Sequence, residues 1–422
     1  MEALREKAIT LDQQDPLKAM RDEFYIPKMP TGKERIYLCG NSLGLQPKRT
    51  ANYIQQELED WKFLGVDGHF EARKPWMPYH EFLTRQMADV VGGQPEEVVV
   101  MNSLTVNLHL LMVSFFRPTK ERFKIMIEKN AFPSDQYAVK SQLEFHGYDA
   151  QAGLLELPPS SGCAYTKKED LLKYIDEHGS ETALILLSGV NYYSGQSFPL
   201  QEIVEAGHKK GCIVGFDLAH AAGNVDCRLH ESGADFAAWC TYKYLNSGPG
   251  GMSGVFIHER HAKDFDLPRF AGWWGHDKTS RFKMPDTFQP EEGAEGWQLS
   301  NPPILAMAAL RASLSIFDEV GIKELRKKSV ALTSFFESCI QSIPTERIQI
   351  ITPKEPSDRG CQLSLRVQGG DKSIFEALSN MGVVSDWREP DVIRIAPVPL
   401  YNSFQEGVLF AEKLEKAVLA DN

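Results

Sequence analysis

The chain has 422 residues, and its 57 acidic residues outnumber its 46 lysines and arginines, giving a formal charge of −11. Its 42% hydrophobic and 24% charged content is near the globular average, which excludes a mainly disordered chain. The acidic balance disfavours a general binder of nucleic acid or of anionic membranes. We therefore expect a protein that acts on small molecules.

No apolar run reaches the roughly 18 residues of a membrane span, and the charged first residues lack the apolar core of a secretory signal. Seven cysteines are scattered along the chain without a C-x-x-C pair. This pattern predicts reduced thiols rather than a disulfide framework or a zinc ribbon. We expect a cytoplasmic protein with no metal site and no membrane partner.

The middle of the chain, roughly residues 50 to 300, alternates short apolar runs with helical stretches. The first residues predict a helix, a loop containing Pro and Gly, and a short strand at 36–38. Later apolar runs lie at 97–101, 123–127, 183–187, 212–216, 236–240 and 255–258. Nearly continuous apolar strands separated by helices are typical of a mostly parallel sheet covered on both faces.

The pattern changes after Pro302-Pro303. A long Ala/Leu-rich helix is predicted at 304–320, ended by Gly321, and a second helix comes next. The later predicted elements are strands at 361–367, 383–387 and 392–395 and a helix at 404–419. Strict alternation in the first of these strands indicates an antiparallel sheet with one buried face. We predict a large α/β domain of residues 50–300 and a small α+β domain of residues 1–49 and 301–422.

Ligands in open α/β sheets bind beyond the carboxyl ends of the strands, so the residues just after each apolar run are candidates for a site. Ser103 and Thr105 come after the first run at a predicted helix start, which suits either a phosphate or an ordinary helix cap. Phe132 and a Ser-Asp pair come after the second run, and a polar loop beginning at Ser188 comes after the third.

Asp217 ends the next run and is followed by His220, while Lys243 comes just after the run 236–240. A metal site would need further ligands that no nearby motif supplies. Lysines are ordinarily solvated, but Lys243 is flanked by Tyr242 and Tyr244, and desolvation makes a lysine amine nucleophilic.

Together these residues predict a site for pyridoxal 5'-phosphate. Lys243 would carry the cofactor covalently, and Asp217 would keep the pyridine nitrogen protonated so that the ring accepts electrons. Ser103 and Thr105 would bind the phosphate. The expected fold is that of the fold-type I pyridoxal-phosphate enzymes.

Beyond these local features, the chain resembles the kynureninases along nearly its whole length. The stretches that carry the resemblance are 37–47, 101–112, 132–135, 216–224, 240–251, 271–284, 300–305 and 393–404. The resemblance implies hydrolysis of L-kynurenine or 3-hydroxy-L-kynurenine to anthranilate or 3-hydroxyanthranilate and L-alanine. This reaction belongs to tryptophan degradation and NAD biosynthesis.

The resemblance also implies a set of site residues. The catalytic residues are Lys243, Tyr242 and Asp217. The cofactor-binding positions are Leu104, Thr105, Phe132, Ser134, Asp135, Ser188, Asp217, His220, Tyr242, Lys243, Trp273 and Asn301. Trp273 and Asn301 match positions that reach the neighbouring subunit's cofactor, which implies a homodimer with shared sites.

For the substrate, the resemblance implies that Arg394 binds the α-carboxylate and that Ser42, His69 and Asn301 lie around the aryl ring. Side chains alternate between the two faces of a strand, so Arg394 points to the face opposite Ile393 and Ile395. Its planar guanidinium can there form two parallel hydrogen bonds to a carboxylate. Polar groups around the ring favour 3-hydroxykynurenine, because a site built to bind a hydroxyl discriminates against its absence.

Three alternatives remain open. The first is a related pyridoxal-phosphate enzyme, such as a cysteine desulfurase or an aminotransferase. A desulfurase needs a cysteine on a mobile loop, but Cys339 and Cys361 lie in a helix and a strand pattern. The second is a non-catalytic relative, which would be expected to lack Lys243 or Asp217. The third is a nicotinamide dehydrogenase, disfavoured because no G-x-G-x-x-G follows the first strand.

Overall fold

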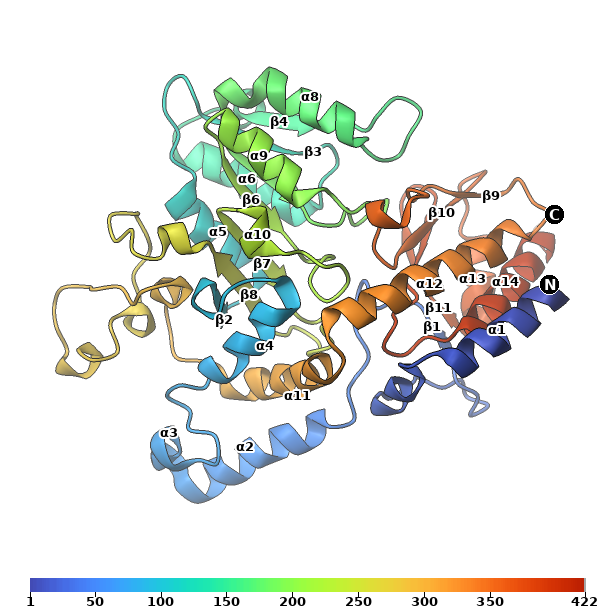
Figure 1. Cartoon of the computed structure of the whole chain (residues 1–422), viewed down its shortest axis with the longest axis horizontal. Coiled ribbons are helices and arrows are strands. Elements are labelled where there is room, and N and C mark those ends of the chain that lie inside the picture. The colour runs from blue at the N-terminus through green and yellow to red at the C-terminus, as the bar shows by residue number, and fades with distance from the viewer. Residues whose placement is uncertain (421–422) are drawn as a thin grey trace.

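The structure is a computed structural model and describes residues 1–420. Within them, the largest sheet contains β2 (Val98–Met101), β3 (Lys124–Glu128), β4 (Leu154–Leu157), β5 (Thr182–Ser188), β6 (Ile213–Asp217), β7 (Phe236–Cys240) and β8 (Ser253–Ile257). Their order is β2–β8–β7–β6–β5–β3–β4 (Figure 1). The strands from β7 to β4 are parallel, and β8 runs antiparallel to both of its neighbours.

Helices cover both faces of this sheet, which explains why its strands are apolar throughout. On β2, Val98 and Val100 pack in one core, while Val99 and Met101 pack in the other. The first core includes side chains of α4 (Glu81–Val91), α8 (Lys168–His178), α9 (Leu200–Lys209) and α11 (Ile304–Val320). The second includes side chains of α5 (Leu104–Phe115) and α6 (Pro133–Phe145).

The predicted fold class is confirmed. Each apolar run of the sequence became a strand of this sheet, with its ends displaced by at most two residues. Strand β4 was missed, because it lies at the edge of the sheet and is only partly buried, so it lacks a continuous apolar signal. The short helices α7 (Ala150–Gly153) and α10 (Leu229–Ser232) connect elements of this layer.

A smaller antiparallel sheet has the strand order β12 (Asp386–Arg388), β13 (Val392–Ile395), β10 (Leu363–Val367) and β9 (Ile348–Ile350). It shares a third core with α1 (Glu2–Gln14), α12 (Ile322–Gln341), α13 (Ser373–Asn380) and α14 (Phe404–Ala420). The two ends of the chain therefore pack together, as the contact of α1 with α14 shows (Figure 1). The predicted strand at 383–387 is divided between β11 (Val383–Val384) and β12.

Helix α11 begins and ends as predicted, but it packs against α4 and against α2 (Thr50–Leu64) beside the large sheet. The proposed domain boundary is therefore better placed near Gly321, between α11 and α12, than at residue 301. The division into two domains stays a prediction, and its last residues, 421–422, lie outside the described residues.

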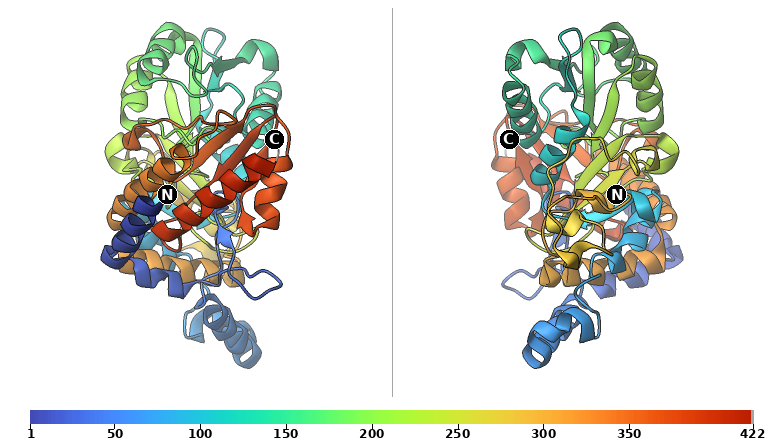
Figure 2. Two further views of the ribbon diagram at one scale, coloured as in Figure 1. Left: turned by 90° about the vertical axis from the view of Figure 1, so that its right-hand side faces the viewer. Right: turned by 90° about the vertical axis from the view of Figure 1, so that its left-hand side faces the viewer.

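Helix α2 and the short α3 (Gly68–Glu71) project from the rest of the molecule (Figure 2). Large apolar side chains on this projection are exposed, among them Trp61, Phe63, Val66 and Phe70. Apolar groups gathered on one projection are typical of an interaction surface. Among the described residues, no helix is both long enough and apolar enough to span a membrane.

The N-terminal segment links the two sheets. Strand β1 (Ile36–Tyr37) pairs in parallel with β11, and the chain then runs over the loop after β7. The Gly44 N–H donates to the carbonyl of Tyr242 at 2.8 Å. A Cβ atom at Gly44 would lie 2.2 Å from the carbonyl oxygen of Lys243, so only glycine permits this close approach.

Candidate active site

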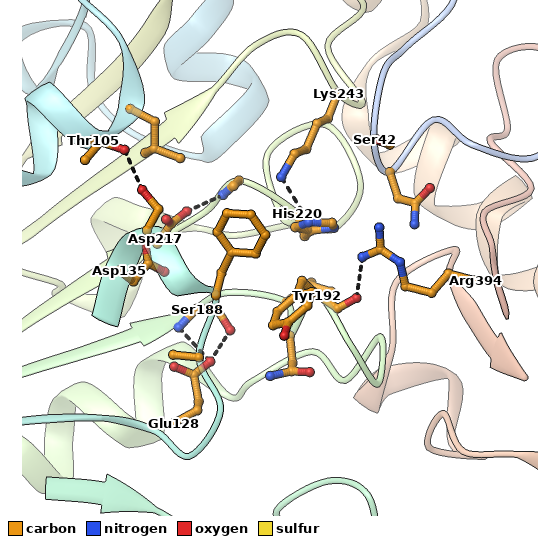
Figure 3. Close-up of a pocket in the computed structure, with 18 of the residues that line it drawn as sticks. Ser42, Thr105, Glu128, Asp135, Ser188, Tyr192, Asp217, His220, Lys243 and Arg394 are labelled. Atoms are coloured by element: carbon orange, nitrogen blue, oxygen red, sulfur yellow. Dashed lines mark hydrogen bonds between the residues drawn. The ribbon is translucent and has the colours of Figure 1, made fainter. Parts of the chain in front are cut away.

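A cavity of about 390 Å³ lies where the carboxyl ends of the parallel strands face the small sheet (Figure 3). The predicted site residues that line it are Ser42, Leu104, Thr105, Phe132, Ser134, Asp135, Ser188, Asp217, His220, Tyr242, Lys243 and Arg394. They come from the carboxyl ends of strands in the large sheet, from the N-terminal segment and from β13. The order of the strands thus brings together residues that are up to 352 positions apart in the sequence.

The structure places the other three predicted residues outside this cavity. His69 lies on the projection, where its ring meets Trp76 edge-on. Trp273 is 41% exposed and lines a separate surface hollow, and Asn301 is exposed.

Two helix starts meet at one end of the cavity. Helix α5 begins directly after β2, and the first turns of α5 and α6 both line the cavity. The Thr105 hydroxyl lies 2.8 Å from the Ser134 hydroxyl. The backbone N–H groups of a first helical turn have no partner within the helix, and the helix dipole adds positive potential. This end of the cavity therefore suits a phosphate.

Carboxyl groups of Asp135, Asp217 and Glu128 cluster beside this end (Figure 3). Burial raises the pKa of Asp217, while the Ala219 N–H, which donates to it at 2.7 Å, and the Lys243 charge oppose that shift. Burial, followed by the charges of Asp217 and Glu128, raises the pKa of Asp135 well above its usual range. The hydrogen bond between the two carboxyls raises the pKa of Asp135 and lowers that of Asp217, so a proton shared by the pair favours Asp135 and negative charge favours Asp217. A cation placed here would be stabilised.

Glu128 ends β3 and holds Ser188, which ends the neighbouring β5. Its carboxylate accepts a hydrogen bond from the Ser188 N–H at 3.0 Å and a second one from the Ser188 hydroxyl. Burial raises the pKa of Glu128. The Ser188 hydroxyl proton is thereby directed away from the centre of the cavity, which leaves its oxygen free to accept a hydrogen bond there.

Lys243 extends into the middle of the cavity, where its Nζ lies 3.0 Å from Nε2 of His220 (Figure 3). Burial and the Lys243 charge lower the pKa of His220 well below its usual value, so the imidazole is neutral and Nε2 accepts from the ammonium. Its Nδ1 then carries a proton, and it is buried without a hydrogen-bond partner among residues 1–420. The Lys243 Nζ also lies 6.0 Å from the centre of the Phe132 ring.

Arg394 enters the cavity from the small sheet and is 1% exposed. Its Nε donates to Oδ1 of Asp386 at 2.7 Å, and its Nη2 donates to the second carboxylate oxygen. Its Nη1 donates to the carbonyl of Tyr192 at 2.7 Å. These contacts fix the plane of the guanidinium, which is what recognition of a carboxylate requires.

Several residues of the site were not predicted from the sequence, namely Asn41, Glu128, Arg388 and also Asp386 behind Arg394, whereas Asn191 and Tyr192 belong to the predicted polar loop that begins at Ser188. Glu128 was detectable, because an acidic residue ending a buried strand stands out in the same way as Asp217. Asp386 and Arg388 alternate with Trp387, but their pairing partner across the sheet cannot be deduced from so short a strand.

The residues present fit pyridoxal phosphate. The two helix starts suit its phosphate, the Asp217 carboxyl suits a protonated ring nitrogen, and the Lys243 amine projects into the same cavity, where it could bond to the aldehyde. The unpartnered Nδ1–H of His220 and the free side of Ser188 supply further polar contacts. None of the cysteines among residues 1–420 lines the cavity.

We predict that Asp135→Asn stabilises the cofactor-free protein increasingly as pH rises. The folded state holds the Asp135 proton to higher pH than the unfolded chain does, so stability falls as pH rises from about 4, the ordinary aspartate pKa, toward the raised value. Asparagine removes this loss. Urea unfolding at pH 5 and pH 8 measures the gain, which should be larger at pH 8. The same change at the exposed Asp22 is the control, and equal effects at both positions would contradict the prediction.

Fold and site together define the class of fold-type I pyridoxal-phosphate enzymes. The cysteine desulfurase of Thermococcus onnurineus has a TM-score of 0.76 and 18% identity, over 96% of this chain and 98% of that chain. A variant of the protein C-DES with glycine linked to its pyridoxal-phosphate cofactor has the same TM-score and 17% identity, over 93% and 98% of the two chains.

Sequence comparison defines the family. Residues 325–414 match the family model of the kynureninase C-terminal domain. The kynureninase of Koribacter versatilis is 57% identical, over 96% of both chains, and that of Myxococcus xanthus is 56% identical, over 96% of this chain and 95% of the other. The chain belongs to the kynureninase family.

Proposed function

We propose that the protein hydrolyses the Cβ–Cγ bond of L-kynurenine or 3-hydroxy-L-kynurenine. Water supplies OH to the γ-carbon and H to the β-carbon, so the products are anthranilate or 3-hydroxyanthranilate and L-alanine. One observation carries this proposal. Lys243, the coupled carboxyls of Asp217 and Asp135, and the Arg394 guanidinium held by Asp386 all lie around one cavity. Membership of the kynureninase family supports the choice of substrate.

The chain's own residues divide the work. Bound pyridoxal phosphate would supply an aldehyde that takes up the substrate amine and a ring that accepts the electron pair left at Cα, and the carbon–nitrogen double bond formed with the substrate amine would accept the electron pair of the Cβ–Cγ bond. Asp217 keeps a proton on the ring nitrogen. Lys243 would hold the cofactor covalently and, as a free amine, would be the base that moves the proton at Cα. Arg394 binds the α-carboxylate and so fixes which bonds at Cα align with the ring.

Tyr242 is the proposed donor to the oxygen of the γ-carbonyl. Burial raises the pKa of its hydroxyl well above the usual value, so the proton stays on the oxygen and is available for donation. Negative charge develops on the γ-oxygen when water adds, and a positioned donor there stabilises the transition state.

We further propose a homodimer in which Trp273, Asn301 and His69 complete the partner's site. Two observations support it. Trp273 is exposed although it is a large aromatic residue, and the projection that carries His69 presents apolar side chains at its surface. The reaction is placed in the cytoplasm, in tryptophan degradation or NAD biosynthesis, and the seven free thiols suit a reducing compartment.

The direct test is to follow release of fluorescent anthranilate from L-kynurenine by protein loaded with pyridoxal phosphate. Stoichiometric anthranilate and L-alanine are expected, and L-cysteine should yield no alanine. Alanine from cysteine and none from kynurenine would overturn the proposal in favour of a desulfurase.

We predict that His69→Phe lowers kcat/KM for 3-hydroxykynurenine more than for kynurenine, by about 10-fold in the ratio, because a hydrogen bond to the ring hydroxyl is lost. His69 contacts the carbonyl of Val66 through Nδ1 at 3.0 Å, which leaves Nε2 for such a bond. Equal losses for both substrates would remove His69 from substrate selection.

A further inference from the structure

Asp386, Arg388 and Arg394 form one cluster, because their side chains share one face of the small sheet. Asp386 on β12 is paired directly opposite Arg394 on β13. Arg388 lies two residues beyond Asp386, so it projects to the same face, while Trp387 between them packs on Phe375. Both arginines line the cavity of the active site.

The hydrogen bonds of Arg394 determine what it can still offer. A guanidinium has five N–H groups. Arg394 gives two of them to Asp386 and one to the Tyr192 carbonyl. One N–H therefore remains on Nη1 and one on Nη2, and both are available to a bound carboxylate.

The charge of Asp386 creates a difficulty for binding an anion. Its carboxylate neutralises Arg394, so the pair alone carries no net charge. The Asp217 carboxylate in the same cavity would repel a second anion. An ion pair with zero net charge is a poor receptor for the α-carboxylate of an amino acid.

Arg388 restores the missing charge. Its Nη2 donates to Oδ2 of Asp386 at 3.3 Å, so a single carboxylate is shared by two guanidinium groups and the cluster has a net charge of +1. The Nε of Arg388 is buried without a hydrogen-bond partner among the described residues. An unpaired buried donor is costly, and an anion in the cavity would relieve that cost.

We propose that Arg388 is a specificity-determining residue for the substrate's α-carboxylate and that Asp386 is the positioning residue that orients Arg394 toward it. The inference rests on the proposed function, since it deepens the role given to Arg394. A bound carboxylate completes a ring of alternating charges, two guanidinium groups and two carboxylates. Arg388 thereby selects amino acids over the corresponding amines.

The test compares two ligands on R388Q, namely L-kynurenine and its decarboxylated analogue, which keeps the amine, carbonyl and aryl ring. We expect the KM for L-kynurenine to rise about 10- to 100-fold, with a smaller change in kcat, because one charged contact is lost. The inhibition constant of the decarboxylated analogue should change by less than about twofold. R388K, which keeps the charge, should recover most of the affinity for L-kynurenine.

The matched control is K372Q. This change removes one positive charge near the same strand, where Lys372 pairs with Glu389 at 2.6 Å, but Lys372 does not line the cavity. The KM of this variant should equal that of the wild type. Equal weakening of both ligands by R388Q, or no change for either, would overturn the inference while an active wild type upholds the proposed function. A wild type that leaves kynurenine intact would overturn both.

Discussion

Replacing Lys243 by alanine is expected to abolish the visible absorbance of the lysine-linked cofactor and to lower the cleavage rate by at least about 10³-fold. Among residues 1–420, Lys243 is the one lysine that lines the cavity, and its Nζ lies beside both His220 and the ring of Phe132. Its loss removes both the covalent attachment and the group that moves the Cα proton. Absorbance spectra and anthranilate fluorescence measure the two effects.

The variant Lys243→Arg distinguishes the loss of the reactive amine from the loss of positive charge. Arginine keeps the positive charge beside the carboxyl cluster, but its guanidinium is neither a nucleophile nor a base at neutral pH. We therefore expect the arginine variant to be as inactive as the alanine variant, with a stability closer to that of the wild type. A coloured and active variant of either kind would show that another amine carries the cofactor.

Replacing Asp217 by asparagine is expected to leave cofactor attachment in place and to lower kcat by about 10²- to 10³-fold. Asp217 is buried at the end of β6, and it is the carboxyl that the Ala219 N–H and the Asp135 proton both hold in its charged form. An amide there cannot hold a proton on the ring nitrogen, so the ring accepts electrons poorly. Steady-state kinetics and pH titration of the cofactor's absorbance measure the change.

Asp235→Asn is the control for Asp217, because it removes a buried carboxylate outside the cavity. Asp235 accepts hydrogen bonds from His208 and His261 at 2.9 Å each, so its loss should lower stability while the absorbance titration stays that of the wild type. If Asp217→Asn kept wild-type kcat, the electron pair left at Cα would have to be stabilised by another group.

The sequence predicted the central part of the site because the rule that locates it is local. A residue that ends a buried parallel strand lies at the edge where ligands bind, whatever the rest of the fold does. Asp217 and Lys243 were found in this way, and both line the cavity. The same rule would also have identified Glu128 as a site residue. Its hydrogen bonds to Ser188 could not be predicted, because they depend on which strand lies beside β3.

The resemblance to kynureninases added residues that no local rule indicates. Arg394 was expected at the substrate carboxylate, and the structure places it in the cavity, buried rather than on the surface. His69, Trp273 and Asn301 lie outside the cavity of this chain, so their assignment depends on the proposed dimer. Without the resemblance, Arg394 would have been interpreted as an ordinary surface arginine and His69 as a loop histidine of no special role.

The sequence by itself determined the class of fold and the order of most strands and helices along the chain. It also determined the strand ends that carry Asp217 and Lys243. All of these follow from patterns of apolar residues within short segments. Only the tertiary structure decided that α11 packs beside the large sheet and that β8 is antiparallel. It alone also placed Asp386 opposite Arg394, with Arg388 beside them. Pairing across a sheet joins segments whose contact leaves no periodic signal. The charge at the carboxylate subsite depends on that pairing.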